Sequence, residues 1–363
     1  MITKASGPRQ ARVWFLFVAI LVSIGTLPAL VSGQRDKAKN GKTSAKAPDL
    51  VWPLPPEKPR IRYLGSLTGS TDVQPPKKKG WLTKLINEEE TRRAIGLGRP
   101  AGIAIDSKGR VYVADTFRGA VFVFDLAKKT LDFIGAEGRG KLANPYGIAI
   151  DLNDNVYVSD TKLKRVHVYD SAGNLSAAIT KIGNETIANP AGLAIDAGRN
   201  RLLIADSRGH KIFVADLNQL NRGTSFGKHG EADDEFNFPN SVVVDHQGRI
   251  YVTDMLNFCV KIFDKDFKFL RRIGEHGTGF GMFDRPKGVT LDSQDHVYVV
   301  DSSFSNFQIF NTDGQLMLFV GGFGVEPGFF RLPSGIHIDG MNRIYVSDQV
   351  NSRVQIFQFL GGN

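Results

Sequence analysis

Residues 100–115 read Pro-Ala-Gly-Ile-Ala-Ile-Asp-Ser-Lys-Gly-Arg-Val-Tyr-Val-Ala-Asp, and variants of this pattern return five more times along the 363-residue chain. In every copy one Asp stands six residues after the Pro, and a second stands 15 residues after it, or 16 in the third copy. Successive copies lie 45, 45, 49, 47 and 47 residues apart, a spacing typical of the blades of a β-propeller. The copies begin at Pro100, Pro145, Pro190, Pro239, Pro286 and Pro333.

Each copy predicts four short antiparallel strands. In the first copy, the apolar residues 102–105 form the first strand, and the Asp that follows can accept hydrogen bonds from the N–H groups of a turn. The second strand is Val111–Val113, the third is Val121–Phe124, and the fourth is Leu131–Ile134 before a Gly-rich bend. Four strands in each of six copies predict an all-β protein with a six-bladed β-propeller over residues 96–363.

The sixth copy shows no fourth strand after its third, Val354–Phe357. Residues 60–65 (Arg-Ile-Arg-Tyr-Leu-Gly) resemble the fourth strand of the fourth copy, residues 269–274 (Phe-Leu-Arg-Arg-Ile-Gly). We therefore predict that residues 60–69 supply the missing strand and close the ring, which hides the sheet edges that an open array of blades would expose.

Residues 1–33 have the pattern of an export signal. Three cations, Lys4, Arg9 and Arg12, precede the apolar segment Val13–Val31, and Pro28 interrupts it where the cleavage region of a signal peptide would begin. Nineteen largely apolar residues could also span a bilayer. Two alternatives stay open, a cleaved signal peptide or a membrane anchor over residues 13–31, and both predict export to the periplasm, the cell envelope or the extracellular space.

Two further segments precede the first copy of the repeat. Residues 34–59 are basic and Pro-rich without apolar periodicity, which predicts a flexible spacer. Residues 75–95 predict a short amphipathic helix, which either covers part of the propeller or, helped by Lys77–Lys79, docks on a membrane or a partner. The apolar face of this helix consists of Trp81, Leu82, Leu85 and Ile86.

The charge of +9 is unevenly distributed. Residues 1–99 carry 18 Lys or Arg and 7 Asp or Glu, whereas residues 100–363 carry 28 and 30, a net charge of −2. The predicted propeller therefore lacks the excess of positive charge that is typical of a nucleic-acid-binding domain. A single cysteine, Cys259, excludes an intramolecular disulfide and a Cys-rich metal site.

The repeated motif resembles the NHL repeat. Its three parts are Pro-x-Gly-[Ile/Leu/Val]-x-[Ile/Leu/Val]-Asp, then Val-Tyr-Val-x-Asp-[Ser/Thr], then Arg-Val-x-[Val/Ile]-Phe, and they recur from Pro100 to Phe357. Together with the Pro-rich lead-in, the chain is similar to exported bacterial NHL repeat-containing proteins. The resemblance implies a six-bladed propeller but not an activity, because relatives include RNA-binding proteins, ubiquitin ligases, an amidating lyase and more distant lactonases.

No motif predicts a catalytic residue or a cofactor. The second Asp of each copy recurs so regularly that a structural capping role is favoured over a metal or general-base role. The resemblance to amidating lyases implies zinc held by inner-strand histidines, but only the sixth copy has one, His337, and zinc needs three or four ligands. The other copies carry Ala104, Ala149, Ala194, Val243 and Thr290 at that position.

The residues that flank the six prolines break the symmetry of the repeat. They should crowd one mouth of the central channel, where several would form a polar, cationic surface for a protein partner or a small anionic ligand. The alternative is that they are ordinary solvated loop residues. The predicted mouth residues are Arg99, Asn144, Tyr146, Asn189, Asn240, Arg285 and Lys287.

The sequence thus favours an exported, non-enzymatic scaffold that binds a partner or ligand at the channel mouth and does not bind nucleic acid. One alternative is a metal-dependent lyase or lactonase-like enzyme that uses the same mouth. Asn144 and Asn189 could contribute calcium ligands in such an enzyme, although no matching acidic set is recognisable. A second alternative is an RNA-binding propeller, against which the export signal and the near-neutral repeats argue.

Overall fold

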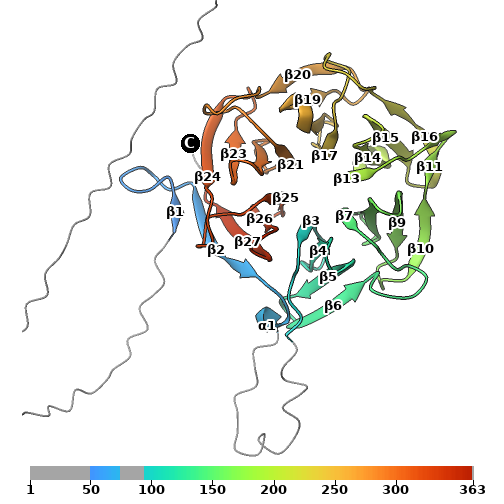
Figure 1. Ribbon diagram of the computed structural model, residues 1–363, viewed down its shortest axis with the longest axis horizontal. Coiled ribbons are helices and arrows are strands. Elements are labelled where there is room, and N and C mark those ends of the chain that lie inside the picture. Colours follow the sequence, from blue (N-terminus) through green and yellow to red (C-terminus); the bar gives the residue numbers. More distant parts are fainter. Residues whose placement is uncertain (1–49, 74–93, 362–363) are drawn as a thin grey trace, which may run out of the picture. The chain divides into compact units, whose positions relative to one another are not determined.

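The computed structural model describes residues 50–73 and 94–361 and shows an all-β fold with six blades around a central channel (Figure 1). The predicted signal or anchor (residues 1–33), the spacer up to residue 49 and the predicted helix up to residue 93 lie outside the described residues. Within the described ranges, no helix has the length and apolar character that crossing a membrane requires.

Blades 1 to 3 follow the predicted strand pattern. Blade 1 consists of β3 (Pro100–Ile105), β4 (Val111–Asp115), β5 (Ala120–Asp125) and β6 (Thr130–Ile134). Blade 2 consists of β7 (Pro145–Ile150), β8 (Val156–Asp160), β9 (Arg165–Tyr169) and β10 (Leu175–Ile179), and the hairpin β11 (Lys181–Ile182) and β12 (Glu185–Thr186) follows. Blade 3 consists of β13 (Pro190–Asp196), β14 (Arg201–Asp206), β15 (Lys211–Asp216) and β16 (Gln219–Phe226), with the turn η3 (Ala197–Arg199).

Blades 4 to 6 repeat the pattern. Blade 4 consists of β17 (Pro239–Val244), β18 (Ile250–Asp254), β19 (Cys259–Phe263) and β20 (Phe269–Ile273), with the turn η4 (Met255–Asn257). Blade 5 consists of β21 (Pro286–Leu291), β22 (Val297–Asp301), β23 (Asn306–Phe310) and β24 (Leu316–Gly321). Blade 6 consists of β25 (Pro333–Ile338), β26 (Arg343–Asp348), β27 (Arg353–Phe359), β2 (Ile61–Leu67) and β1 (Val51–Trp52).

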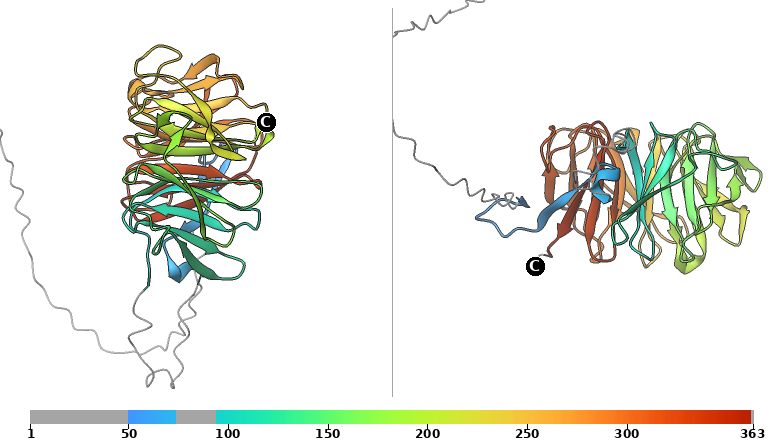
Figure 2. Two further views of the ribbon diagram at one scale, coloured as in Figure 1. Left: turned by 90° about the vertical axis from the view of Figure 1, so that its right-hand side faces the viewer. Right: turned by 90° about the horizontal axis from the view of Figure 1, so that it is seen from below.

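The first strand of each blade is innermost (Figure 1), and its Pro pairs with the second Asp of the same copy, as Pro100 pairs with Asp115. A proline fits the first residue of a strand because it has no N–H to give to the ladder. Seen from the side, the strands run from one face of the ring to the other (Figure 2). We call the face with the six Pro–Asp pairs the proline face, and the face with the turns after the first Asp of each copy the aspartate face.

The Gly two residues after the Pro lets neighbouring blades approach each other. A Cβ on Gly102 would lie 2.4 Å from the carbonyl oxygen of Tyr146 in blade 2, and one on Gly335 would lie 2.2 Å from that of Ala101 in blade 1. Both distances are shorter than any real contact, so a larger residue would push the inner strands apart. The inner strands therefore form a tight ring around the channel.

The predicted closure of the ring is confirmed. Strand β2 pairs antiparallel with β27 from Ile61–Phe359 to Leu67–Val354, within the predicted residues 60–69. Strand β1 adds a fifth strand outside β2, through Val51–Arg62 and Trp52–Ile61 pairs. The predicted spacer therefore ends in an ordered strand.

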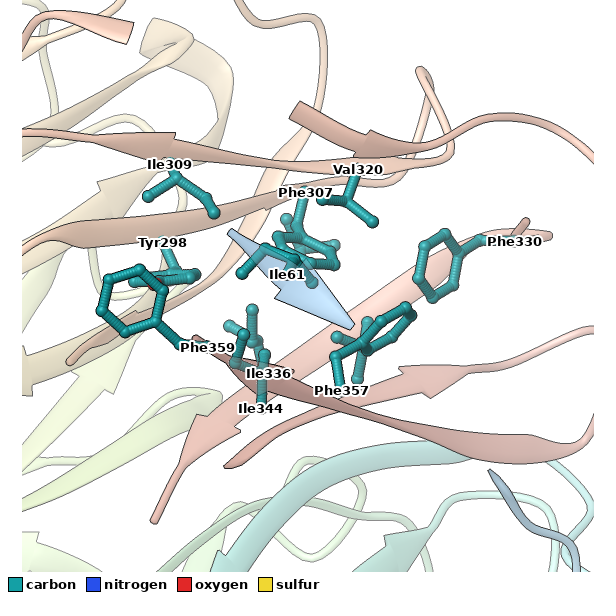
Figure 3. Close-up of a cluster of buried hydrophobic side chains, with 12 residues drawn as sticks. Ile61, Tyr298, Phe307, Ile309, Val320, Phe330, Ile336, Ile344, Phe357 and Phe359 are labelled. Atoms are coloured by element: carbon teal, nitrogen blue, oxygen red, sulfur yellow. The ribbon is translucent and has the colours of Figure 1, made fainter. Parts of the chain in front are cut away.

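Side chains from the N-terminal strand β2 and from the last two blades meet in one hydrophobic cluster (Figure 3). Ile61 of β2 lies fully buried between Phe307 of blade 5 and Phe357 of blade 6. The two phenyl rings meet edge to face, with centroids 5.5 Å apart. Full burial of a side chain such as Ile61 contributes about 1.5–3 kcal/mol, so the N-terminal strand fastens the last blade to the ring.

Candidate functional site

The second Asp of each copy caps backbone donors, as predicted from its regular recurrence. In blade 1, the buried carboxylate of Asp115 accepts hydrogen bonds from the amides of Gly98 (2.6 Å), Arg99 (3.1 Å), Phe117 (3.0 Å) and Arg118 (2.9 Å). Each carboxylate joins the loop that enters its blade to the turn between the second and third strands. The equivalent carboxylates belong to Asp160, Asp206, Asp254, Asp301 and Asp348.

Blade 4 adds a buried ion pair to this arrangement. The Lys261 ammonium lies 3.1 Å from the Asp254 carboxylate and donates to the carbonyl oxygen of Ala232 at 2.7 Å. Burial raises the pKa of Asp254, and the positive charge of Lys261 opposes this effect. Lys261 is itself buried, so this pair holds the blade 4 loop rather than facing a ligand.

Two predicted mouth residues, Asn144 and Asn189, are engaged within their own blades. The Asn144 amide donates to the hydroxyl of Thr161 at 2.8 Å, and the Asn189 amide donates to that of Ser207 at 2.6 Å. In each case the partner directly follows the capping Asp. These two side chains therefore position the loops of the proline face and do not meet in a common site.

Two other predicted residues, Tyr146 and Asn240, meet across the channel. The Tyr146 hydroxyl lies 3.1 Å from Oδ1 of Asn240 and 3.5 Å from Oγ of Ser334, so the phenol from blade 2 reaches residues of blades 4 and 6. Ala101, Ala191 and Ser334 directly follow the Pro of their copies, as Tyr146 and Asn240 do, and are only 1%, 3% and 2% exposed. A tyrosine side chain thus reaches across the predicted mouth.

The three predicted cations lie outside this closure. Arg99 and Arg285 are exposed and Lys287 is partly buried. Within residues 50–73 and 94–361, none of the three forms an ion pair. These three cations can contact a ligand or partner on the proline face, but they do not line one common pocket.

A groove between blades 1 and 2 on the proline face gathers cations that the sequence reasoning missed. Phe117 at its edge is 75% exposed, and the Arg118 guanidinium lies 5.8 Å from the centre of this ring. No carboxylate lines the groove among the described residues, and its cations have no ion pair there. The groove has a volume of about 420 Å³ and is lined by Phe117, Arg118, Gly119, Lys141, Leu142, Ala143, Lys162 and Leu163.

Two predicted residues border this groove. The amide of Arg99 shares the Asp115 carboxylate with the amides of Phe117 and Arg118, which holds Arg99 near the groove. Asn144 directly follows Ala143, and its bond to Thr161, the residue before Lys162, joins the two segments that blade 2 contributes to the groove. The sequence signal for the groove was the basic residue two or three positions after the capping Asp in blades 1 to 3, namely Arg118, Lys162 and Arg208.

The channel holds a second cavity of about 250 Å³, lined by the inner strands of all six blades. His337 and Thr290 line this cavity, and neither side chain has a hydrogen bond to a described residue. Burial lowers the pKa of His337 to about 4, so the imidazole is neutral at pH 7. Among the described residues, no group of three or more His, Cys, Asp or Glu side chains is placed to hold a metal.

The comparisons with known protein families agree with the architecture. Residues 231–303 match a family described as a 6-bladed beta-propeller. Residues 97–124 and 330–357 match the NHL repeat, in the first and sixth blades. The chain is therefore a six-bladed β-propeller with NHL repeats in its first and sixth blades. No curated protein matches its sequence.

Similar solved structures are enzymes with the same kind of fold. A catalytically inactive virginiamycin B lyase from Staphylococcus aureus, solved with quinupristin, is 12% identical, with a TM-score of 0.53 over 76% of this chain and 83% of that chain. A gluconolactonase from Xanthomonas campestris is 14% identical, with a TM-score of 0.56 over 72% of this chain and 86% of that chain. At such low identities the likeness shows the fold alone, since one fold hosts many activities.

Proposed function

We propose that this protein is a non-enzymatic scaffold that binds an acidic segment of a protein partner in the groove between blades 1 and 2. The observation that carries the proposal is the set of three cations, Arg118, Lys141 and Lys162, that line the groove with an exposed Phe117 and without a described carboxylate in the lining. Arg99 at the border adds a fourth positive charge.

The groove combines two features of partner-binding surfaces. An exposed aromatic ring gives an apolar anchor, and arginine and aromatic residues are frequent among the side chains that dominate binding energy. Unpaired cations attract an acidic partner and accelerate its association. A protein segment that presents carboxylates beside an apolar side chain would satisfy both features, whereas a free small anion would use only the charges.

The proposed scaffold is exported. The basic residues Lys4, Arg9 and Arg12 before the apolar segment 13–31 support this part of the proposal. Separation of periplasm, membrane and cytoplasm from cells that make the full-length protein tests it. Recovery of the protein in the cytoplasm alone would contradict export.

The binding test uses a fluorescein-labelled peptide of alternating Glu and Phe residues and the full-length protein. The variant R118A/K141A/K162A should bind the peptide at least tenfold more weakly at about 0.1 M salt, because the loss of interfacial charge-assisted contacts costs affinity. The control K128A/K265A/K268A removes the same charge from the aspartate face and should bind like the wild type.

Three results of this experiment would contradict the proposal. The first is equal peptide affinity of R118A/K141A/K162A and K128A/K265A/K268A. The second is binding of acetate or phosphate as tight as that of the peptide. The third is a salt-sensitive complex with RNA that is tighter than the complex with the peptide. The last result would favour the RNA-binding alternative.

A metal-dependent lyase or lactonase-like enzyme fits the residues poorly. Among the described residues, the channel cavity offers one imidazole and no carboxylate, whereas a zinc site needs three or four ligands and calcium six to eight oxygens. Elemental analysis of the purified protein, made with zinc and calcium present, tests this alternative. One metal ion per chain would favour it.

A further inference from the structure

We propose that the central channel contains a second binding site, for a small uncharged molecule with hydrogen-bonding groups, which enters from the aspartate face. The site is independent of the groove between blades 1 and 2. It consists of the cavity between the inner strands, where Thr290 of β21 and His337 of β25 are polar groups near mid-channel. The other polar side chains of the lining, at the proline-face end, are Tyr146, Asn240, Ser241 and Ser334.

The cavity is large enough for an organic molecule. Its volume is about 250 Å³, and an apolar protein cavity of about 150 Å³ accommodates benzene, so by proportion it has room for about ten non-hydrogen atoms. Its wall is about half apolar, from alanine and β-branched side chains of the inner strands, and about half polar. This composition is typical of sites that bury most of a small ligand.

Two polar side chains without hydrogen-bond partners lie on one side of the cavity. Thr290 is only 6% exposed, and neither its hydroxyl nor the His337 imidazole has a hydrogen bond to a described residue. Both stand four residues after the Pro of their copies, in the adjacent blades 5 and 6, so they lie on the same side of the channel. Both groups line the cavity, so a ligand or water inside it can form the hydrogen bonds that no described residue supplies.

The electrostatics of the cavity favour an uncharged ligand. Among the described residues, none that lines it has a charged side chain, and His337 is neutral at pH 7. A carboxylate or an ammonium group would lose its hydration without meeting an opposite charge. An amide or alcohol can instead donate to or accept from the hydroxyl and the imidazole.

The two ends of the channel differ in access. At the proline face, the Tyr146 side chain crosses the channel and its hydroxyl lies 3.1 Å from Oδ1 of Asn240 and 3.5 Å from Oγ of Ser334. At the aspartate face, all six residues that stand five positions after the Pro are partly exposed. These residues are Ile105, Ile150, Ile195, Val244, Leu291 and Ile338. The cavity is thus a blind pocket with an apolar rim.

The test compares three probes of similar size by calorimetry and by saturation-transfer NMR. ε-Caprolactam is uncharged and can donate and accept hydrogen bonds, methylcyclohexane is apolar, and cyclohexanecarboxylate is anionic. We expect saturable binding of caprolactam at one site per chain, and at least tenfold weaker binding of the carboxylate, because its charge would be buried unpaired.

The repeat itself supplies matched variants. Thr290→Val and His337→Ala introduce residues that already occupy the equivalent positions as Val243 and Ala149, so the fold should tolerate both. Each should weaken caprolactam binding about 3- to 10-fold, the effect of one neutral hydrogen bond, and leave methylcyclohexane binding unchanged. The space-filling variant Ala194→Leu should weaken the binding of both probes.

The outcomes decide the proposal. Absence of saturable caprolactam binding to the wild type would overturn it, as would equal caprolactam affinity of the wild type, Thr290→Val and His337→Ala. Preferential binding of cyclohexanecarboxylate would also overturn it. Thermal unfolding of each variant shows that the protein is folded, and peptide binding in the groove should be the same for all of them.

Discussion

The ring of capping aspartates and the ring of channel side chains lie on the same six blades but follow opposite rules. Every blade has the capping Asp, the second Asp of its copy, and each of these carboxylates accepts hydrogen bonds from backbone N–H groups. Four residues after the Pro, the six blades carry Ala104, Ala149, Ala194, Val243, Thr290 and His337. The first ring repeats because each blade needs the same cap, whereas the second ring varies because no single side chain is needed for packing. The difference teaches that the repeated residues build the fold and that candidate binding groups stand where the copies differ.

The largest expected effect comes from breaking a cap. Asp115→Ala leaves four amides without their acceptor, those of Gly98, Arg99, Phe117 and Arg118. Unpaired donors cost about 1–3 kcal/mol each when buried, and these four are partly buried, so we expect a total loss of about 4 kcal/mol or more. Urea unfolding measures it. The channel variant Thr290→Val should lose less than about 1 kcal/mol, and equal losses for both variants would contradict the comparison.

The closing strand offers the next effect. Ile61→Ala should destabilise the protein by about 2–5 kcal/mol, because it removes a fully buried side chain between blades 5 and 6. Leu64→Ala on the same strand is the control, since Leu64 is half exposed and should cost less than about 1 kcal/mol. Equal stability of the two variants would show that β2 does not fasten the ring as described.

The channel histidine predicts a pH dependence. Burial lowers the pKa of His337 to about 4, so between about pH 6.5 and 4 the unfolded chain binds a proton that the folded protein does not. The stability contributed by neutral His337 is present above pH 6.5 and is lost as the pH falls, by up to about 3 kcal/mol. Urea unfolding of the wild type and His337→Ala at pH 7 and pH 4.5 measures the difference. Parallel losses of stability in both proteins would contradict it.

The smallest effect on stability is expected in the groove. R118A/K141A/K162A should change the free energy of unfolding by less than about 0.5 kcal/mol per substitution, as is typical of exposed residues without ion pairs. Thermal unfolding checks this expectation. A large loss of stability would assign these cations a structural role, so they would count among the residues that build the fold and not among the candidate binding groups.

The repeat carried enough information to predict most of the fold. Pro-to-Asp spacing predicted the blades, and the likeness of residues 60–65 to residues 269–274 predicted the closing strand. Strand β1 (Val51–Trp52) was not predicted, because two residues in a Pro-rich segment show no alternation of apolar and polar side chains. The caps were predictable, since a residue that recurs in all copies must serve each blade.

The candidate sites were harder to predict because they depend on distances between blades. The bond of Asn144 to Thr161 could have been inferred, since the Pro145–Asp160 pair brings their flanking residues together. The reach of Tyr146 to Asn240 depends on the width of the channel, which no spacing within a copy gives. The groove likewise depends on how two neighbouring blades meet.

The most direct test of the central claim is hydrogen exchange of the full-length protein with and without the Glu–Phe peptide. If the binding groups stand where the copies differ, protection should appear in residues 116–119 and 161–163 of blades 1 and 2. The equivalent turns of blades 4 and 5, residues 255–258 and 302–305, should exchange as in the free protein. Equal protection of all four turns, or protection of blades 4 and 5 alone, would contradict the account.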